Sequence, residues 1–129
     1  MPFNGKVLLV DDEAHIRTFM RLLLGQLGTP TIIEASNGND AISKYKSEAP
    51  DLVLLDVNMP IMDGIGALKG IMAHDPNAII IMLTSQSSRS LINQAAEIGA
   101  SNYIRKDTPK DEILKSLRET IEACFEEED

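Results

Sequence analysis

The sequence predicts an α/β fold: a single doubly wound (βα)5 domain with a five-stranded parallel sheet of order 2-1-3-4-5 and helices on both faces. Two observations predict it. Short apolar runs without polar alternation indicate strands that are covered on both faces, as in parallel sheets. An apolar pattern at helical spacing follows each run, and such units connect through right-handed crossovers, for which 2-1-3-4-5 is the natural order of five strands.

Five segments are predicted to be strands, each bounded by turn residues. Three are strongly apolar, and the second and fifth are weaker candidates. In chain order they are residues 7–10, 31–34, 52–55, 78–83 and 101–105. The third run is followed by Asp56 and then by a loop with Asn58, Pro60 and Gly64, so Asp56 is predicted to lie at a strand tip.

Apolar residues at helical spacing follow each strand candidate. The first helix is predicted to end at Gly28 and Pro30, because glycine and proline are common just beyond a helix terminus. The apolar residues of the predicted helices are, in chain order, Ile16, Phe19, Met20, Leu23 and Leu27; Ala41, Ile42 and Tyr45; Leu68, Ile71 and Met72; Leu91, Ala95 and Ile98; and Ile113, Leu117, Ile121 and Cys124. The chain shows no linker or internal repeat, which favours one domain over residues 1–129.

The chain is acidic, with a formal net charge of −8. An acidic surface argues against direct binding to nucleic acid or to an anionic membrane, so the partners are expected to be proteins. No apolar run is long enough for membrane insertion, and a cytoplasmic location is expected. The lone Cys124 excludes an internal disulfide and is expected to be a buried thiol in a reducing compartment.

Polar residues follow four of the five strand candidates. In this architecture ligands bind at the carboxyl ends of the strands, so these residues are expected to converge on one crevice. They are Asp11, Asp12 and Glu13 after the first strand, Asp56 after the third, Thr84 and Ser85 after the fourth, and Lys106 after the fifth.

Crowded carboxylates at Asp11, Asp12 and Asp56 require a compensating cation, because two unit charges ~4 Å apart cost several kcal/mol near a protein surface. A hard divalent ion with oxygen ligands fits, and Mg²⁺ fits best because it takes few carboxylates and keeps several waters. Lys106 supplies a second positive charge. Together with the Thr84 hydroxyl, these groups have what is needed to transfer a phosphoryl group to Asp56.

With these residues in place, the sequence from about residue 6 to residue 125 resembles the response-regulator receiver domains of two-component signalling. The resemblance is carried by four motifs in order: LLVDDE, LVLLDVNMPIMDG, IIMLTS and GASNYIRK. It implies that Asp56 accepts phosphate from a histidine kinase. It also implies that Asp12 binds Mg²⁺ directly, that Asp11 acts largely through water, and that the backbone carbonyl of Asn58 completes the protein ligands.

The resemblance further implies that Thr84 and Lys106 hold the phosphoryl oxygens, and that Tyr103 swings inward as Thr84 moves. One position departs from the family pattern, in which a proline with a cis bond usually follows the lysine. Here Asp107 follows Lys106. A cis bond before Asp107 would cost about 3 kcal/mol, so the loop is expected to be either trans and reshaped or strained. Because of this departure, the sequence does not predict whether the kinase-docking surface nearby has the form usual in the family. The Asp107 carboxylate is expected to weaken the local positive field.

Each motif residue also has a plainer interpretation. Asp12 is a favoured helix N-cap, and Thr84 or Ser85 is a candidate cap for the fourth helix. Lys106 alone reads as a solvated lysine, and Tyr103 alone as a strand residue packed at the sheet edge. The order of the motifs favours the receiver interpretation over these coincidences.

The expected function is a phosphorylation-controlled switch that catalyses only its own phosphorylation and dephosphorylation. The expected partners are a sensor histidine kinase or phosphotransfer protein and a downstream effector protein, as for stand-alone chemotaxis regulators. Two alternatives stay open: an interaction module that works without phosphorylation, and a receiver fragment of a larger regulator. A flavodoxin-like protein is disfavoured because carboxylates after the first strand would repel a flavin phosphate, and a phosphatase because Asn58 stands where it needs an acid.

Overall fold

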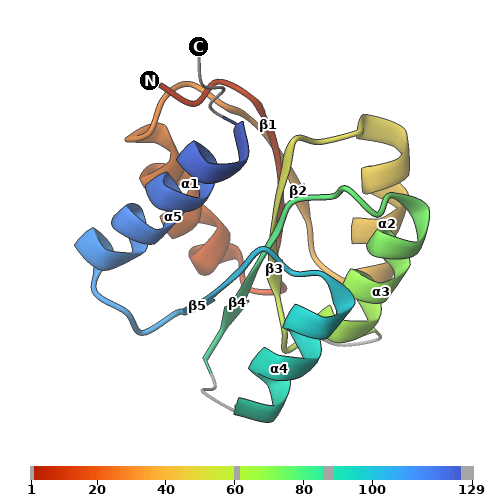
Figure 1. The fold of residues 1–129 in the computed structure, drawn as a ribbon. Helices are drawn as coiled ribbons and strands as arrows, with labels where there is room; N and C mark the ends of the chain where they lie inside the picture. The colour runs from red at the N-terminus through yellow and green to blue at the C-terminus, as the bar shows by residue number, and fades with distance from the viewer. Residues whose placement is uncertain (1, 60–61, 86–88, 126–129) are drawn as a thin grey trace.

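A computed structural model describes residues 2–59, 62–85 and 89–125, which form a parallel sheet between two layers of helices (Figure 1). The strand order is β2-β1-β3-β4-β5, as the sequence predicts. The elements are β1 (Lys6–Val10), α1 (Ala14–Gly25), β2 (Thr31–Ala35), α2 (Gly38–Glu48), β3 (Leu52–Asp56), α3 (Gly64–His74), β4 (Ile80–Thr84), α4 (Arg89–Ile98), β5 (Asn102–Arg105) and α5 (Lys110–Phe125).

The two sides of the sheet bury two separate apolar clusters, because successive side chains of a strand point to opposite faces. In β1, Val7 and Leu9 pack with α1 and α5, whereas Leu8 and Val10 pack with α2, α3 and α4. Figure 1 shows the same division, with α1 and α5 on one side of the sheet and the other helices opposite. Every residue of β3 and β4 is buried, which explains why these strands read as continuous apolar runs.

The predicted end of the first helix is wrong. Helix α1 ends at Gly25, and the N–H of Gln26 donates to the carbonyl of Leu23 in a tightened last turn. Gly28 serves a different purpose, because a Cβ there would lie 2.2 Å from the backbone oxygen of Phe3. The glycine makes room for the N-terminal segment, whose Phe3 N–H donates to the Leu27 carbonyl.

The expectation that Cys124 is buried is also wrong, since its side chain is exposed. The buried stripe of α5 runs through Leu117 and Ile121 and continues at Phe125, four residues further on. The Phe125 ring packs against Phe3, with ring centroids 5.3 Å apart. Across the described ranges, none of the helices combines the length and the hydropathy that a transmembrane segment requires.

Candidate functional site

The strand register brings the carboxylates of Asp11 and Asp56 side by side. Val10 pairs with Leu55 in the parallel ladder of β1 and β3, so the residues that follow them lie at the same edge of the sheet. Both carboxylates are buried, with Asp11 0% and Asp56 1% exposed. Two buried carboxylates at one edge of a sheet need positive charge nearby.

Lys106 supplies that charge from the end of β5. Its Nζ lies 2.7 Å from Oδ2 of Asp11 and 3.0 Å from Oδ1 of Asp56, and its side chain is 14% exposed. The backbone fixes this position, because the N–H of Lys106 donates to the carbonyl of Thr84 at 2.7 Å. Three strands thus contribute one charged group each to a single buried cluster.

Burial and charge shift the pKa values of this cluster. Desolvation raises the pKa of Asp56 to about 6; the Lys106 hydrogen bond opposes this rise, and the neighbouring Asp11 charge adds to it. Burial by itself would lower the pKa of Lys106, but hydrogen bonds to Asp11 and Asp56 outweigh burial and raise it. Lys106 is therefore charged at neutral pH, and Asp56 is mostly ionised.

The donor atoms fit a hard divalent cation. Asp11, Asp12 and Asp56 each offer a carboxylate oxygen, and these atoms lie within 4.8 Å of one another. Asp12 is exposed, so the cluster opens to solvent on its side. Within the described part of the chain, the buried Oδ2 of Asp56 accepts no hydrogen bond. An oxygen-only set with a free buried acceptor suits Mg²⁺, which keeps waters alongside few carboxylates.

The structure contradicts the plain interpretation of Asp12 as a helix cap. The N-cap residue of α1 is Glu13, whose side chain makes no capping hydrogen bond. The N–H of Glu13 instead donates to Oδ1 of Asp11 at 2.9 Å. The start of α1 is thus tied to the acidic cluster through Asp11, and the cap interpretation of Asp12 is wrong. The interpretation of Thr84 or Ser85 as a cap of α4 concerns a part of the chain that includes residues 86–88, which lie outside the described residues; the helix is described from Arg89 onward.

Three other predicted site residues lie on or after strands β3, β4 and β5. Asn58 is exposed and its N–H donates to Oδ1 of Asp56 at 3.3 Å. Thr84 is fully buried at the end of β4, next to β5. Tyr103 of β5 is half-buried and lines a cavity of about 210 Å³ together with Ile92 and Ala95 of α4. Asn58 contacts the cluster directly, whereas Tyr103 lies further back on β5, beside α4. The functional roles expected of these residues stay predictions.

The peptide bond between Lys106 and Asp107 is trans, which is one of the two expected alternatives, because the described residues contain no cis peptide bond. The Asp107 carboxylate pairs with the Arg105 guanidinium at 2.6 Å on the surface. Arg105 therefore balances the extra acid locally, while Lys106 is paired with the buried carboxylates.

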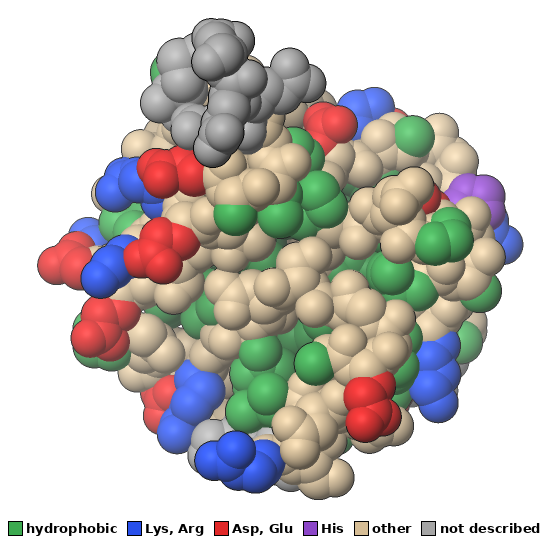
Figure 2. All heavy atoms as spheres, viewed as in Figure 1, with side chains coloured by type: hydrophobic (Ala, Val, Ile, Leu, Met, Phe, Trp, Pro, Cys, Tyr) green, Lys and Arg blue, Asp and Glu red, His purple; other side chains and the backbone are tan. Residues whose placement is uncertain are grey.

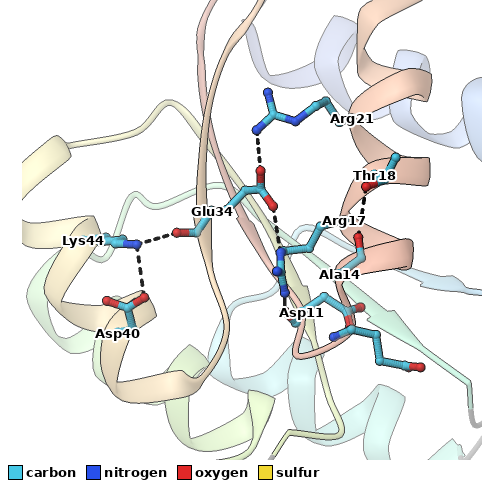
Figure 3. Close-up of polar contacts among 9 residues, drawn as sticks. Asp11, Ala14, Arg17, Thr18, Arg21, Glu34, Asp40 and Lys44 are labelled. Carbon is cyan, nitrogen blue, oxygen red and sulfur yellow. Dashed lines mark hydrogen bonds and ion pairs between the residues drawn. The ribbon is translucent and has the colours of Figure 1, made fainter.

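Sequence reasoning missed a polar network behind the acidic cluster, which Figure 3 draws. Arg17 of α1 donates from Nη1 to the backbone carbonyl of Asp11 at 2.6 Å and from Nε to Oε1 of Glu34 in β2 at 2.7 Å. Arg21 bonds the second oxygen of the same Glu34. A glutamate inside an apolar strand, facing arginines one helical turn apart, is the signal that would have found this network.

Comparison with known proteins agrees with this geometry. Residues 7–118 match the family described as the response regulator receiver domain. The chemotaxis protein CheY of Bacillus subtilis is 39% identical over 116 residues, which span 90% of this chain and 97% of that protein. The chemotaxis protein CheY of Thermotoga maritima is 37% identical over 112 residues, which span 87% and 93%.

The fold of the described chain is shared with solved structures as well. One is the crystal structure of a CheX-CheY-BeF3-Mg²⁺ complex from Borrelia burgdorferi, matched with a TM-score of 0.85 and 31% identity over 95% of this chain and 90% of that one. The family match covers most of the sequence, and the relatives are matched along nearly their whole length. The chain therefore belongs to the response regulator receiver domain family, with CheY-like relatives.

Proposed function

We propose that this chain is a phosphorylation-controlled signalling switch in which Asp56 accepts a phosphoryl group from the phosphohistidine of a histidine kinase or phosphotransfer protein. The observation that carries the proposal is the buried triad of Lys106, Asp11 and Asp56. Asp56 offers a buried oxygen that accepts no hydrogen bond within the described residues. Its neighbours are the groups that would bind the phosphoryl oxygens.

The proposed reaction forms a bond between an Asp56 oxygen and phosphorus while the bond from phosphorus to the histidine nitrogen breaks. The leaving imidazole keeps that electron pair and takes up a proton. Lys106 would hold positive charge beside the phosphoryl oxygens, and the hydroxyl of Thr84, which is buried at the end of β4, would donate a hydrogen bond to one of them. A bound Mg²⁺, held by Asp11, Asp12, Asp56 and the Asn58 carbonyl, would supply further charge neutralisation.

The proposed output is binding of a downstream effector protein. Modification of Asp56 would bias a second conformation of the segment after Thr84, α4 and Tyr103. The cavity beside Tyr103 has the apolar Ile92 and Ala95 as neighbours and gives the ring space to move. Figure 2 shows apolar side chains gathered near the middle of this face, with charged groups mostly toward its edges. Such a surface suits a protein partner more than a polyanion.

The switch is proposed to consist of a single domain and to act in the cytoplasm. Residues 1–129 would act as one receiver domain in the cytoplasm and turn over only their own phosphate, rather than a small-molecule substrate. The Borrelia burgdorferi relative is a complex of CheY with CheX, BeF3 and Mg²⁺, which supports partner binding and metal dependence here. The similarity in sequence to the chemotaxis protein CheY of two bacteria supports a role in a two-component pathway.

The first test is incubation with Mg²⁺ and acetyl phosphate, followed by intact mass, with Asp56→Asn as the matched control. One added phosphoryl group that needs Mg²⁺ and is lost in the variant is the expected result. No added group in a folded protein would overturn the proposal and favour a receiver-fold interaction module that works without phosphorylation.

A further inference from the structure

Arg17 links the acidic cluster to the far edge of the sheet. Its guanidinium holds the backbone carbonyl of Asp11 at 2.6 Å and the Glu34 carboxylate at 2.7 Å, so one side chain joins α1, the end of β1 and β2 (Figure 3). The Arg17 side chain is 19% exposed, which places these bonds in a partly desolvated setting. A planar guanidinium with two hydrogen-bond partners constrains their relative positions better than a single point charge does.

The carbonyl that Arg17 holds belongs to the peptide between Asp11 and Asp12. Asp11 is tied on its other sides as well: its N–H donates to the Ala35 carbonyl at 3.1 Å, and its carboxylate takes the Glu13 N–H and the Lys106 ammonium. Arg17 fixes the plane of the next peptide. That plane sets the direction in which the exposed Asp12 leaves the strand.

Glu34 keeps Arg17 in place. Hydrogen bonds from Arg21 and then Arg17 lower the pKa of Glu34, so the carboxylate stays ionised throughout the neutral range. The backbone of Glu34 is secured in turn, because Lys44 Nζ donates to its carbonyl at 2.5 Å. Arg21 shares Glu34 with Arg17, but its side chain is 48% exposed and, among the described residues, it makes no hydrogen bond to Asp11. The chain thus contains a natural matched control for Arg17.

We infer that Arg17 is a positioning residue: by clamping the peptide between Asp11 and Asp12 to Glu34, it sets the spacing of the carboxylates that would hold Mg²⁺. The inference rests on the proposed function of the same site. Partners that orient metal ligands from behind commonly matter for affinity even though they do not touch the metal.

A charge effect and a positioning effect have opposite signs here. Arg17 is a cation in contact with Asp11, one of the three clustered aspartates, so neutralising it would strengthen cation binding if only its charge mattered. Loss of positioning would weaken cation binding instead. Arg17→Lys separates the two further, since lysine keeps the charge but lacks the planar fork.

The test measures Mn²⁺ affinity from the electron paramagnetic resonance signal of free Mn²⁺, for wild type, Arg17→Met, Arg17→Lys and Arg21→Met. Thermal unfolding is recorded in parallel to confirm that each variant is folded. Both Arg17 variants are expected to bind Mn²⁺ about tenfold more weakly. Arg21→Met is expected to match wild type in affinity, although it also removes a bond to Glu34.

Tighter binding by Arg17→Met would overturn the inference in favour of a charge effect alone. Equal losses in the Arg17 and Arg21 variants would overturn it in favour of general stability. If Arg17→Met does not fold, Arg17→Lys against Arg21→Met decides the question. Metal affinity is read without phosphoryl transfer, so wild-type protein that binds Mn²⁺ but gains no phosphate refutes the proposed function and still tests Arg17.

Discussion

The Lys106 ammonium lies 3.0 Å from the Asp56 carboxylate, at the ends of strands that are separated in the sheet by β4. The same ammonium contacts Asp11 at 2.7 Å. Asp11 and Asp56 are almost fully buried, so this one lysine compensates two carboxylates in a setting where water screens little. The stability of the fold and the charge state of the site are therefore set by the same side chain.

Replacement of Lys106 by methionine is expected to destabilise the metal-free protein by about 3 kcal/mol, because it leaves two buried carboxylates without their cation. The loss is expected to shrink when Mg²⁺ is added, since the ion restores positive charge. Chemical denaturation with and without Mg²⁺ measures both effects. Lys115→Met is the control, because Lys115 is 78% exposed and pairs only weakly with Glu119. Equal losses in the two variants would contradict the prediction.

Asp56→Asn is expected to stabilise the metal-free protein at pH 7.5. The folded pKa of Asp56, about 6, lies above its ordinary value of 3.8, because burial disfavours the ionised form. The free energy of unfolding is therefore not reduced by Asp56 below about pH 4, where the carboxyl group is protonated in both states. It falls as the pH rises from about 4 to about 6, because only the unfolded state then releases the proton readily. The corresponding gain for the variant at pH 7.5 is about 2–3 kcal/mol.

Denaturant unfolding at several pH values, in the presence of a chelator, tests this expectation. The difference between Asp56→Asn and wild type should grow between about pH 4 and pH 6 and stay constant above that range. A variant that is less stable than wild type at pH 7.5 would mean that the ionised carboxylate is favourably held, against the direction of its pKa.

Binding of Mg²⁺ is expected to weaken as pH falls below about 6, because protons compete for the Asp56 carboxylate whose pKa lies there. Isothermal titration calorimetry at pH 5, 6 and 7.5 measures the change, with about a tenfold loss of affinity expected per pH unit below the pKa. Affinity that stays constant down to pH 5 would show that Asp56 is not among the groups that bind the ion.

Much of the site could be predicted from the sequence because parallel topology leaves little freedom. Asp11, Asp56 and Lys106 come from distant parts of the chain, yet each follows a buried strand, and the carboxyl ends of parallel strands share one edge. The same logic predicted the strand order that the structure shows.

Other features could not be predicted because they depend on packing between elements. Cys124 and Phe125 both follow Ile121 at a helical spacing, and the contact with Phe3 shows that Phe125 is the one that the fold partly covers. Arg17 reads as an ordinary surface arginine until the register of β2 brings Glu34 beside it. The local pattern marks Glu34 as a polar residue in an apolar strand, but it does not say which arginine meets it.

Gly64→Ala is expected to destabilise the protein by at least about 2 kcal/mol and to slow phosphorylation. A Cβ on Gly64 would lie 2.1 Å from the backbone oxygen of Asp56 and 2.6 Å from Cα of Val57, and backbone atoms cannot move aside as a flexible side chain can. Relief of this clash would shift the strand end that carries Asp56. Gly25→Ala is the control, because nothing lies within 4 Å of its Cβ and alanine favours the helix. Denaturant unfolding and intact mass after acetyl phosphate treatment give the two readouts. Wild-type stability in Gly64→Ala would show that the loop before α3 adapts without disturbing Asp56.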